Sequence, residues 1–390
     1  MTEIFDCLVI GAGIEGSCTA FQLARNGFKT LLVEQFYLPH TRGSSHGHSR
    51  IIRKAYDKEI YTNMMKEAYS WWESIERQVG KPMLRKCGLV YCGDKDIPEM
   101  KNLPNLLTKY GVTHKVYQNA RELSQDYPMF QFGDSLAFVL EKEAGMLRSD
   151  NCLAGVQKLF VKFGGKINDG TKVVEIIPGQ VVTVRTTNGS YKAKSLVICA
   201  GPWAGQLLKP LGLHLPLKPI AVNVVYWREN LHGIASADKN PTFVINGDEE
   251  SELSEHFYGL PADEYPNHYK FCYHSGPVVD PDDRDADKHR SINDMILKDM
   301  IRFVNAHFPT LEPKPSIVER CMYTNTPDSD FILDTHPHWK NIVIGAGFSG
   351  HGFKMAPVVG KVLMELAVGR QPSYDLSTFA IRRFDSKAKL

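Results

Sequence analysis

The chain has 390 residues, 43% of them hydrophobic, and its 46 lysines and arginines stand against 44 aspartates and glutamates. This length and composition exclude a disordered chain and predict a core large enough for two domains. The balanced charge supplies no positive field for nucleic acid or an anionic membrane surface, so we expect neither as a partner.

The eight cysteines are scattered without a CxxC pair, and most lie in apolar runs such as SLVICAG. This pattern is typical of reduced, buried thiols in an intracellular compartment, and we expect no metal site. The start MTEIFDCLVIGAG lacks a basic leader, and no apolar run approaches the length of a membrane span. We therefore expect neither a signal peptide nor a transmembrane segment.

The N-terminal segment reads as a strand, a helix and a second strand. A buried strand over 7–10 leads into a glycine turn, a helix that Gly27 closes, and a strand that ends at Glu34. The turn carries a GxGxxG motif, formed by Gly11, Gly13 and Gly16. Such glycines permit a tight turn, close approach to a pyrophosphate and close packing of helix on strand, and Glu34 is placed to bind a ribose. The segment predicts a dinucleotide site, for which NAD and FAD are both candidates.

Two strand patterns follow along the chain. GTKVVEII, VVTVRTT and KSLVICAGPWAGQLL predict further strands of the first sheet. KCGLVYCGD, IAVNVVYWRE, HFYGLPADEY and YKFCYHSGP alternate apolar and polar residues, as strands of an antiparallel sheet with one exposed face do. We predict a first domain over 1–85, 148–215 and 315–390 that is interrupted by a second domain over 86–147 and 216–314.

A second glycine turn lies near the C-terminus, in NIVIGAGFSGHGFKMAPVVGKVLMELAVG. Gly345, Gly347 and Gly350 also fit GxGxxG, but the chain after Gly369 has no buried strand with a terminal acid to complete a second βαβ unit. One long cofactor, with its adenylate half on the first turn and its other end near the second, explains both turns. FAD suits this arrangement better than NAD.

The motifs GSSHGHSRIIRKAY, CMYTNTPD, FILDTHP and AGFSGHGFK resemble those of the monomeric sarcosine oxidase family nearly word for word, and the resemblance spans the chain. It implies an α/β (α+β) fold with a Rossmann-like FAD-binding domain of the glutathione-reductase/D-amino-acid-oxidase type and an interleaved antiparallel-sheet substrate domain. It also implies a monomer that oxidises secondary amino acids with O2 and releases H2O2. Sarcosine would give glycine and formaldehyde, and L-pipecolate or L-proline a cyclic imine.

Three alternatives stay open beside this hypothesis. One is another oxidase of the same fold, acting on D-amino acids, glycine or dimethylglycine, against which the CMYT cysteine and SGHGFK argue. Another is a catalytically silent flavin-binding or metabolite-sensing protein, which the presence of Lys270, Arg53 and Lys354 disfavours. The most distant is a nicotinamide-linked dehydrogenase. The sequence does not rank sarcosine, L-pipecolate and L-proline.

The resemblance assigns Cys321, in CMYTNTPD, to a covalent 8α-thioether with one FAD per chain. A thiolate must add to an electrophilic flavin, so we expect a basic neighbourhood, which SSHGHSRIIRKAY can supply. By resemblance, His46 and Arg50 lie beside the flavin. Arg53 binds the substrate carboxylate, whose two oxygens suit a planar guanidinium.

The resemblance also assigns a second carboxylate-binding cation and an oxygen-activating one. Lys354, in SGHGFK, would contact both the carboxylate and the cofactor. Lys270 would lie near flavin N5, where a fixed positive charge stabilises the negative charge that develops on O2. His274 and Tyr258 complete the implied catalytic residues, and Tyr323 joins the substrate site. The remaining implied cofactor contacts are Ser45, Val174, Gly347, Gly350 and His351.

The last three residues, Ala388-Lys389-Leu390, are a close variant of the S-K-L peroxisomal signal. They predict a peroxisomal matrix protein that is recognised by an import receptor. Peroxide production, which the resemblance implies, agrees with that compartment.

Overall fold

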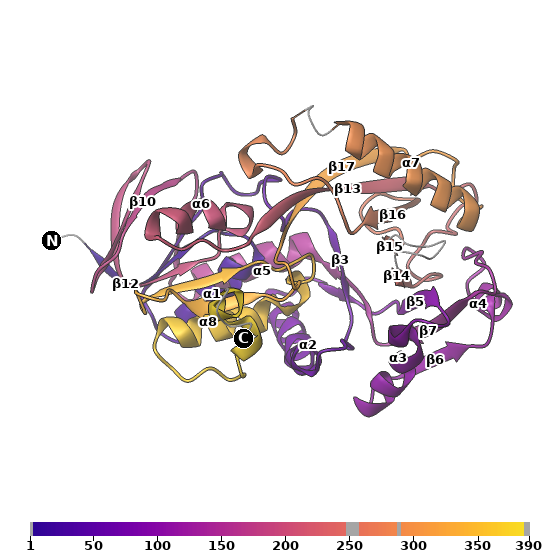
Figure 1. The fold of residues 1–390 in the computed structure, drawn as a ribbon, viewed down its shortest axis with the longest axis horizontal. Coiled ribbons are helices and arrows are strands. Elements are labelled where there is room, and N and C mark those ends of the chain that lie inside the picture. The colour runs from indigo at the N-terminus through magenta and orange to yellow at the C-terminus, as the bar shows by residue number, and fades with distance from the viewer. Residues whose placement is uncertain (1–2, 247–256, 287–289, 386–390) are drawn as a thin grey trace.

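The computed structural model describes residues 3–246, 257–286 and 290–385, which form three β-sheets with helices packed on them. The first sheet occupies the left half of Figure 1 and the second the right half. Ala388-Lys389-Leu390 lie outside the described residues. Among the helices in these ranges, none is long and apolar enough to cross a membrane. The same ranges contain no group of three or more side chains that could hold a metal ion.

The first sheet has parallel strands at its centre. Its order is β10 (Val173–Ile177), β11 (Val182–Thr186), β12 (Gly189–Ile198), β1 (Ile4–Ile10), β2 (Thr30–Val33) and β9 (Lys166–Asn168), with β19 (Ile342–Ala346) between β12 and β18 (Ile332–Thr335). The pairs β1–β2, β1–β12 and β12–β19 are parallel. The strands that we predicted from GTKVVEII, VVTVRTT and KSLVICAG are therefore confirmed as members of this sheet.

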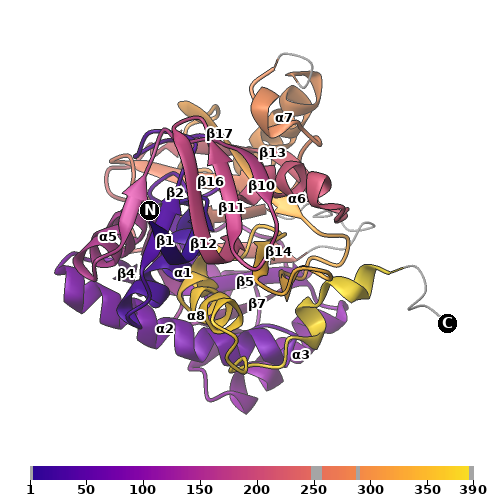
Figure 2. The same cartoon turned by 90° about the vertical axis from the view of Figure 1, so that its left-hand side faces the viewer.

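Four helices pack beside the first sheet: α1 (Ile14–Arg25), α2 (Glu59–Val79), α5 (Ser149–Lys162) and α8 (Ala356–Ala367). Figure 2 shows α1, α8 and α2 on one side of it. Short elements, including α6 (Ala204–Leu208), pack through Leu208 into the hydrophobic cluster formed by β1, β2 and β12. Because apolar side chains cover both faces, residues 7–10 of β1 and 31–33 of β2 are continuous apolar runs rather than alternating ones.

The N-terminal glycine turn lies at the carboxyl end of β1. Gly11 has a φ of +99°, and a Cβ there would lie 2.4 Å from the carbonyl oxygen of Cys199. A Cβ at Gly16 would lie 1.9 Å from the carbonyl oxygen of Gly11, so α1 can start this close to β1 only with glycine at that position. The predicted strand, turn and helix are confirmed.

The second sheet has eight strands and joins distant parts of the chain. Its order is β17 (Ile317–Asn325), β13 (Lys218–Arg228), β16 (His268–Tyr273), β15 (Phe257–Leu260), β14 (Thr242–Asn246), β5 (Leu89–Asp94), β7 (Leu136–Glu141) and β6 (His114–Tyr117). We expected an antiparallel sheet, but β5 and β14 pair in parallel. That pair joins segment 86–147 to segment 216–314, and nothing in the local alternation of either strand specifies its direction.

Helices α3 (Pro98–Lys109), α4 (Ala120–Asp126) and α7 (Arg290–His307) cover the second sheet. Its core is aromatic, with Phe130, Trp227, Phe243, Phe271 and Phe308 buried in one cluster. This core holds β13, β14, β15 and β16 together.

A small third sheet lies between the two large ones. It pairs β3 (Ser49–Ile52) with β8 (Gly145–Arg148), and β8 with β4 (Leu84–Arg85). The chain crosses between the large sheets again near its end, because β17 belongs to the second sheet whereas β18 and β19 belong to the first. Segment 315–390 thus begins in the second sheet, and the domain boundaries that we placed along the sequence stay a prediction.

Candidate active site

Two adjacent cavities are lined by residues of both large sheets. The larger has a volume of about 1010 Å³ and the smaller about 280 Å³. They share six lining residues: His46, Gly47, Arg50, Tyr323, Gly350 and Phe353. Because they share a wall, a long ligand in the larger cavity would present one end to a small molecule in the smaller one.

The N-terminal glycine turn and the end of β2 line the larger cavity. Gly11, Gly13 and the first residues of α1 form part of its wall, so the helix N-terminus faces the space. Ser45 Oγ accepts a hydrogen bond from the Ile14 amide at 3.0 Å and lies against Gly13, where a Cβ would approach it to 3.1 Å. The exposed side chain of Val174 also lines this cavity.

Glu34 has the position that a ribose-binding acid requires. It is buried, and its carboxylate accepts hydrogen bonds from the Ala12 amide at 2.8 Å and the Phe36 amide at 3.1 Å. Thr324 lines the same cavity, and its buried Oγ1 has no partner among the described residues. A helix N-terminus that faces the cavity, a fixed acid and an unpaired hydroxyl fit a dinucleotide such as FAD.

The second glycine turn joins the two cavities. Gly350, with a φ of +75°, lines both, and a Cβ there would lie 2.4 Å from the His274 ring and 2.9 Å from the Tyr323 ring. Gly347 lines neither cavity, and a Cβ on it would instead meet the methyl group of Thr326 at 2.4 Å. Gly16 likewise lies behind the wall, where it packs α1 on β1.

The smaller cavity brings together every catalytic and substrate-binding residue that we predicted. Together with the predicted cofactor residues Cys321 and His351, they lie on or next to β3, β15, β16, β17 and the second glycine turn: His46, Arg50, Arg53, Tyr258, Lys270, His274, Cys321, Tyr323, His351 and Lys354. The hydroxyls of Tyr258 and Tyr323 are 2.5 Å apart. Burial holds the pKa of His351 well below its usual range, so this imidazole is neutral, and its Nδ1 has no partner within the described chain.

Among the described residues, neither Arg53 nor Lys354 forms an ion pair with an acid, although the buried Glu141 lies near enough to Arg53 to interact with it electrostatically. The Arg53 guanidinium lies 4.5 Å from the centroid of the Tyr56 ring, and Lys354 Nζ donates to the Tyr56 hydroxyl at 2.9 Å. Lys354 is buried in a short 3-10 turn, Phe353–Met355, directly before α8. Burial lowers its pKa, which an anion bound beside it would oppose.

Cys321 lies beside a basic pair, as we expected. Its Sγ is 4.0 Å from His46 Nδ1, and Arg50 is held nearby through the carbonyl oxygens of Ser44 and His46. Burial raises the pKa of this thiol, but His46 and Arg50 outweigh burial and lower it to about 7. In the other seven cysteines burial raises the pKa.

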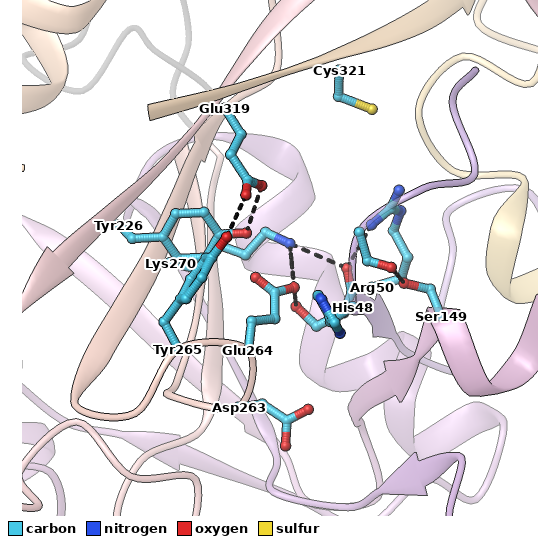
Figure 3. A network of polar contacts seen from close by, with 12 residues as sticks. His48, Arg50, Ser149, Tyr226, Asp263, Glu264, Tyr265, Lys270, Glu319 and Cys321 are labelled. Carbon is cyan, nitrogen blue, oxygen red and sulfur yellow. Dashed lines mark hydrogen bonds and ion pairs between the residues drawn. The ribbon is translucent and has the colours of Figure 1, made fainter. Parts of the chain in front are cut away.

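Lys270 differs from the other cations because it has a carboxylate of its own. Its ammonium forms an ion pair with Glu264 at 2.8 Å (Figure 3). Both groups also contact Ser49. Sequence reasoning missed Glu264 and Tyr56. The only signal for Glu264 was an acid in the turn between two strands of a predicted hairpin, and Tyr56 carried no signal beyond its place after Arg53.

Known proteins resemble this chain over its whole length. The profile of the DAO family, described as FAD dependent oxidoreductase, matches residues 6–366. Peroxisomal sarcosine oxidase of Mus musculus is 48% identical, with 100% of this chain and 98% of the relative covered. Monomeric sarcosine oxidase of Bacillus sp. (strain NS-129) is 30% identical, with 98% of each covered. The solved structure of NikD, an unusual amino acid oxidase essential for nikkomycin biosynthesis, has a TM-score of 0.83 at 23% identity, over 97% of this chain and 98% of that one.

The environment of Cys321 predicts a reactive thiol. In flavin-free protein, its alkylation by iodoacetamide should rise with pH around a midpoint of about 7, because only the thiolate reacts. His46→Asn should move that midpoint upward and slow alkylation at neutral pH roughly 10-fold. Cys272 is a matched control in the same cavity, since burial raises its pKa to about 11 and it should react slowly. A Cys321 midpoint in the ordinary thiol range, unchanged in the variant, would contradict the assignment.

Proposed function

The chain belongs to the DAO family of FAD-dependent oxidoreductases, and we propose that it is a sarcosine-oxidase-type enzyme that oxidises secondary amino acids with O2. The observation that carries this proposal is the pair Arg53 and Lys354, two cations that form no ion pair within the described chain and line a small cavity that shares a wall with the cofactor cavity. Such a pair is suited to a carboxylate. We therefore favour sarcosine, L-pipecolate and L-proline as the substrate class.

The substrate would lie with its carboxylate on Arg53 and Lys354 and its carbon chain against the apolar part of the wall. That part is formed by Ile51, Val224, Val244, Ile245 and Leu260. An apolar wall accepts either the methyl group of sarcosine or the ring of L-pipecolate or L-proline, which is why the cavity alone does not rank them. Tyr258, Tyr323 and His274 would surround the amine.

The overall reaction moves two protons and two electrons from the CH–NH group to O2, giving an imine and H2O2. FAD, when bound, accepts the hydride equivalent from the carbon next to nitrogen. The nitrogen lone pair must assist that step, so only the neutral amine reacts, and amine oxidation should accelerate as pH rises through the pKa of the bound amine. Lys270 would supply the positive charge that stabilises charge developing on O2.

We further propose that Cys321 carries the flavin through a thioether. The nearby His46 and Arg50 support a thiolate at this position, and they would stabilise negative charge on the ring during attachment. Of the remaining cofactor assignments, Gly11, Gly13, Glu34, Ser45, Val174, Gly350 and His351 line the two cavities, whereas Gly16 and Gly347 would act through packing.

We also propose a peroxisomal matrix location and a monomeric state. Support for the location comes from Ala388-Lys389-Leu390, which would bind the import receptor, and from the name of the mouse relative. The monomeric state follows the name of the Bacillus relative. Release of H2O2 agrees with the compartment.

A substrate panel under anaerobic conditions tests the activity. L-Pipecolate, L-proline or sarcosine should bleach the yellow colour, and the same compounds should give H2O2 in air. Piperidine, which is L-pipecolate without its carboxylate, should react at least about 30-fold more slowly, corresponding to about 2 kcal/mol of lost pairing with Arg53 and Lys354.

Each other outcome of the panel points to a different protein. Equal bleaching by piperidine would contradict the carboxylate site. Reaction only with D-amino acids, glycine or dimethylglycine would identify another oxidase of the fold, and no bleaching at all would indicate a silent flavin protein.

Acid precipitation tests the covalent link. The wild-type pellet should stay yellow, whereas Cys321→Ala should leave its flavin in the supernatant because the thioether is lost. Cys272→Ala, which removes another thiol of the same cavity, should keep a yellow pellet. A colourless wild-type pellet, or a yellow one from Cys321→Ala, would contradict the assignment.

A further inference from the structure

We propose that Glu264 is a positioning residue that fixes the Lys270 ammonium at the wall of the smaller cavity and keeps it charged at alkaline pH. The inference rests on the proposed function, because it concerns the step in which O2 is reduced. It assigns a role to a side chain that does not itself line the cavity.

The ammonium of Lys270 has all three of its donors engaged. Nζ lies 2.8 Å from Glu264 Oε1, 3.2 Å from Ser49 Oγ and 3.3 Å from the Ser49 carbonyl oxygen. Ser49 Oγ in turn donates to Glu264 Oε1 at 2.5 Å, which closes a triangle of contacts. The side chains of Lys270 and Glu264 are only 6% and 3% exposed, so bulk water does little to weaken this pair.

The triangle is assembled from two sheets. Glu264 and Lys270 belong to the hairpin between β15 and β16, and Ser49 is the first residue of β3. Figure 3 shows the Lys270 ammonium pointing toward Glu264. Cys321 lies on β17, which is separated from β16 by β13. The pair therefore sets where the charge lies relative to the flavin-linking cysteine that we proposed.

A second carboxylate lies nearby, but its oxygens are engaged elsewhere. Glu319 accepts hydrogen bonds from the hydroxyls of Tyr226 at 3.2 Å and Tyr265 at 2.6 Å. The other titratable groups on the elements around Lys270 are Arg50, Tyr226, Tyr258, Cys272 and His274. Burial and the two carboxylates raise the pKa of Tyr226, and burial raises that of Cys272, so both stay neutral. Glu264 is thus the direct counter-charge of Lys270.

Glu264 is ionised wherever the enzyme would work. Burial raises the pKa of this carboxyl, but Lys270 and the hydrogen bond from Ser49 outweigh burial and lower it to about 2. A buried ammonium without a counter-charge releases its proton more readily. Amine oxidation needs the neutral amine and improves as pH rises, whereas O2 reduction needs a charged lysine. With the Glu264 carboxylate 2.8 Å from its ammonium, Lys270 can stay charged at the pH values at which the substrate amine is neutral.

The test measures reoxidation of the holoenzyme by O2 from pH 6.5 to 10 after reduction with dithionite, which bypasses the amine. Glu264→Gln should reoxidise within about threefold of wild type near pH 6.5, where the lysine keeps its proton. As pH rises, the reoxidation rate of the variant should begin to fall at least about one pH unit earlier than the rate of wild type. By pH 9 the variant should therefore be roughly 10-fold slower than wild type. Glu264→Asp keeps the charge and should restore most of the wild-type profile.

Asp263→Asn is the matched control. Asp263 is the neighbouring residue and equally buried, but it pairs with Arg148 at 2.8 Å, not with Lys270. Its removal should leave the pH profile of reoxidation in place. A Glu264→Gln profile identical to wild type, or slowed by the same factor at every pH, would overturn the inference. If that variant does not fold, Ser49→Ala should shift the profile in the same direction, and an unshifted profile there would overturn the inference as well.

Thermal unfolding gives a readout that does not depend on turnover. Glu264→Gln and Lys270→Met should each lower the Tm by about 5 °C or more, because each leaves a buried group unpaired, and the double variant should lose less than the sum. Additive losses would show that the two side chains do not act as a pair. If wild type oxidises no amine, the proposed function is wrong. If wild type oxidises amines but the Glu264 variants do not show the predicted changes, only the role of Glu264 is wrong.

Discussion

The smaller cavity depends on how its positive charges are compensated. Arg50, Arg53, Lys270 and Lys354 line one space of about 280 Å³, and removing cations from water is costly unless other groups replace the hydration. The compensation is unequal. Lys270 has a carboxylate in direct contact, and Arg50 has three backbone carbonyls and the nearby Cys321. Arg53 lies over the rings of Tyr56 and Tyr91, with Glu141 acting on it only from beyond ion-pair distance, and Lys354 contacts Tyr56 and a backbone carbonyl.

That inequality gives the cations different tasks in the proposed reaction. A substrate carboxylate completes the environment of Arg53 and Lys354, so binding relieves an electrostatic cost that the protein carries alone. Lys270 is already paired and offers less attraction to a carboxylate, which leaves it for charge that appears later, on O2. Arg50 and His46 favour a thiolate at Cys321. The fold makes this possible because β3, β16, β17 and the turn before α8 meet at one wall.

The features that could be predicted from sequence are those with local causes. The strand, turn and helix around Gly11 follow from adjacent residues, and the alternating strands of the second sheet follow from their own pattern. The residues that line the smaller cavity were predicted from the resemblance of long sequence motifs to those of a known family. Contacts between elements that are distant in the sequence or joined by a turn could not be predicted. These are the parallel pairing of β5 with β14, the hydrogen bond of Lys354 to Tyr56, and the Lys270–Glu264 ion pair. Each contact depends on which segments the three sheets bring together. The sequence around a single acid or tyrosine in a turn does not indicate which residue it will contact.

The division of the cations between the two half-reactions is the central claim, and anaerobic stopped-flow measurements on Lys270→Met test it most directly. Flavin reduction by the amino acid should stay within about threefold of wild type, because Arg53 and Lys354 still hold the carboxylate. Reoxidation by O2 should slow by at least about 100-fold, the range found when a preorganised charge or donor is removed from a reaction site. Equal slowing of both half-reactions would contradict the account.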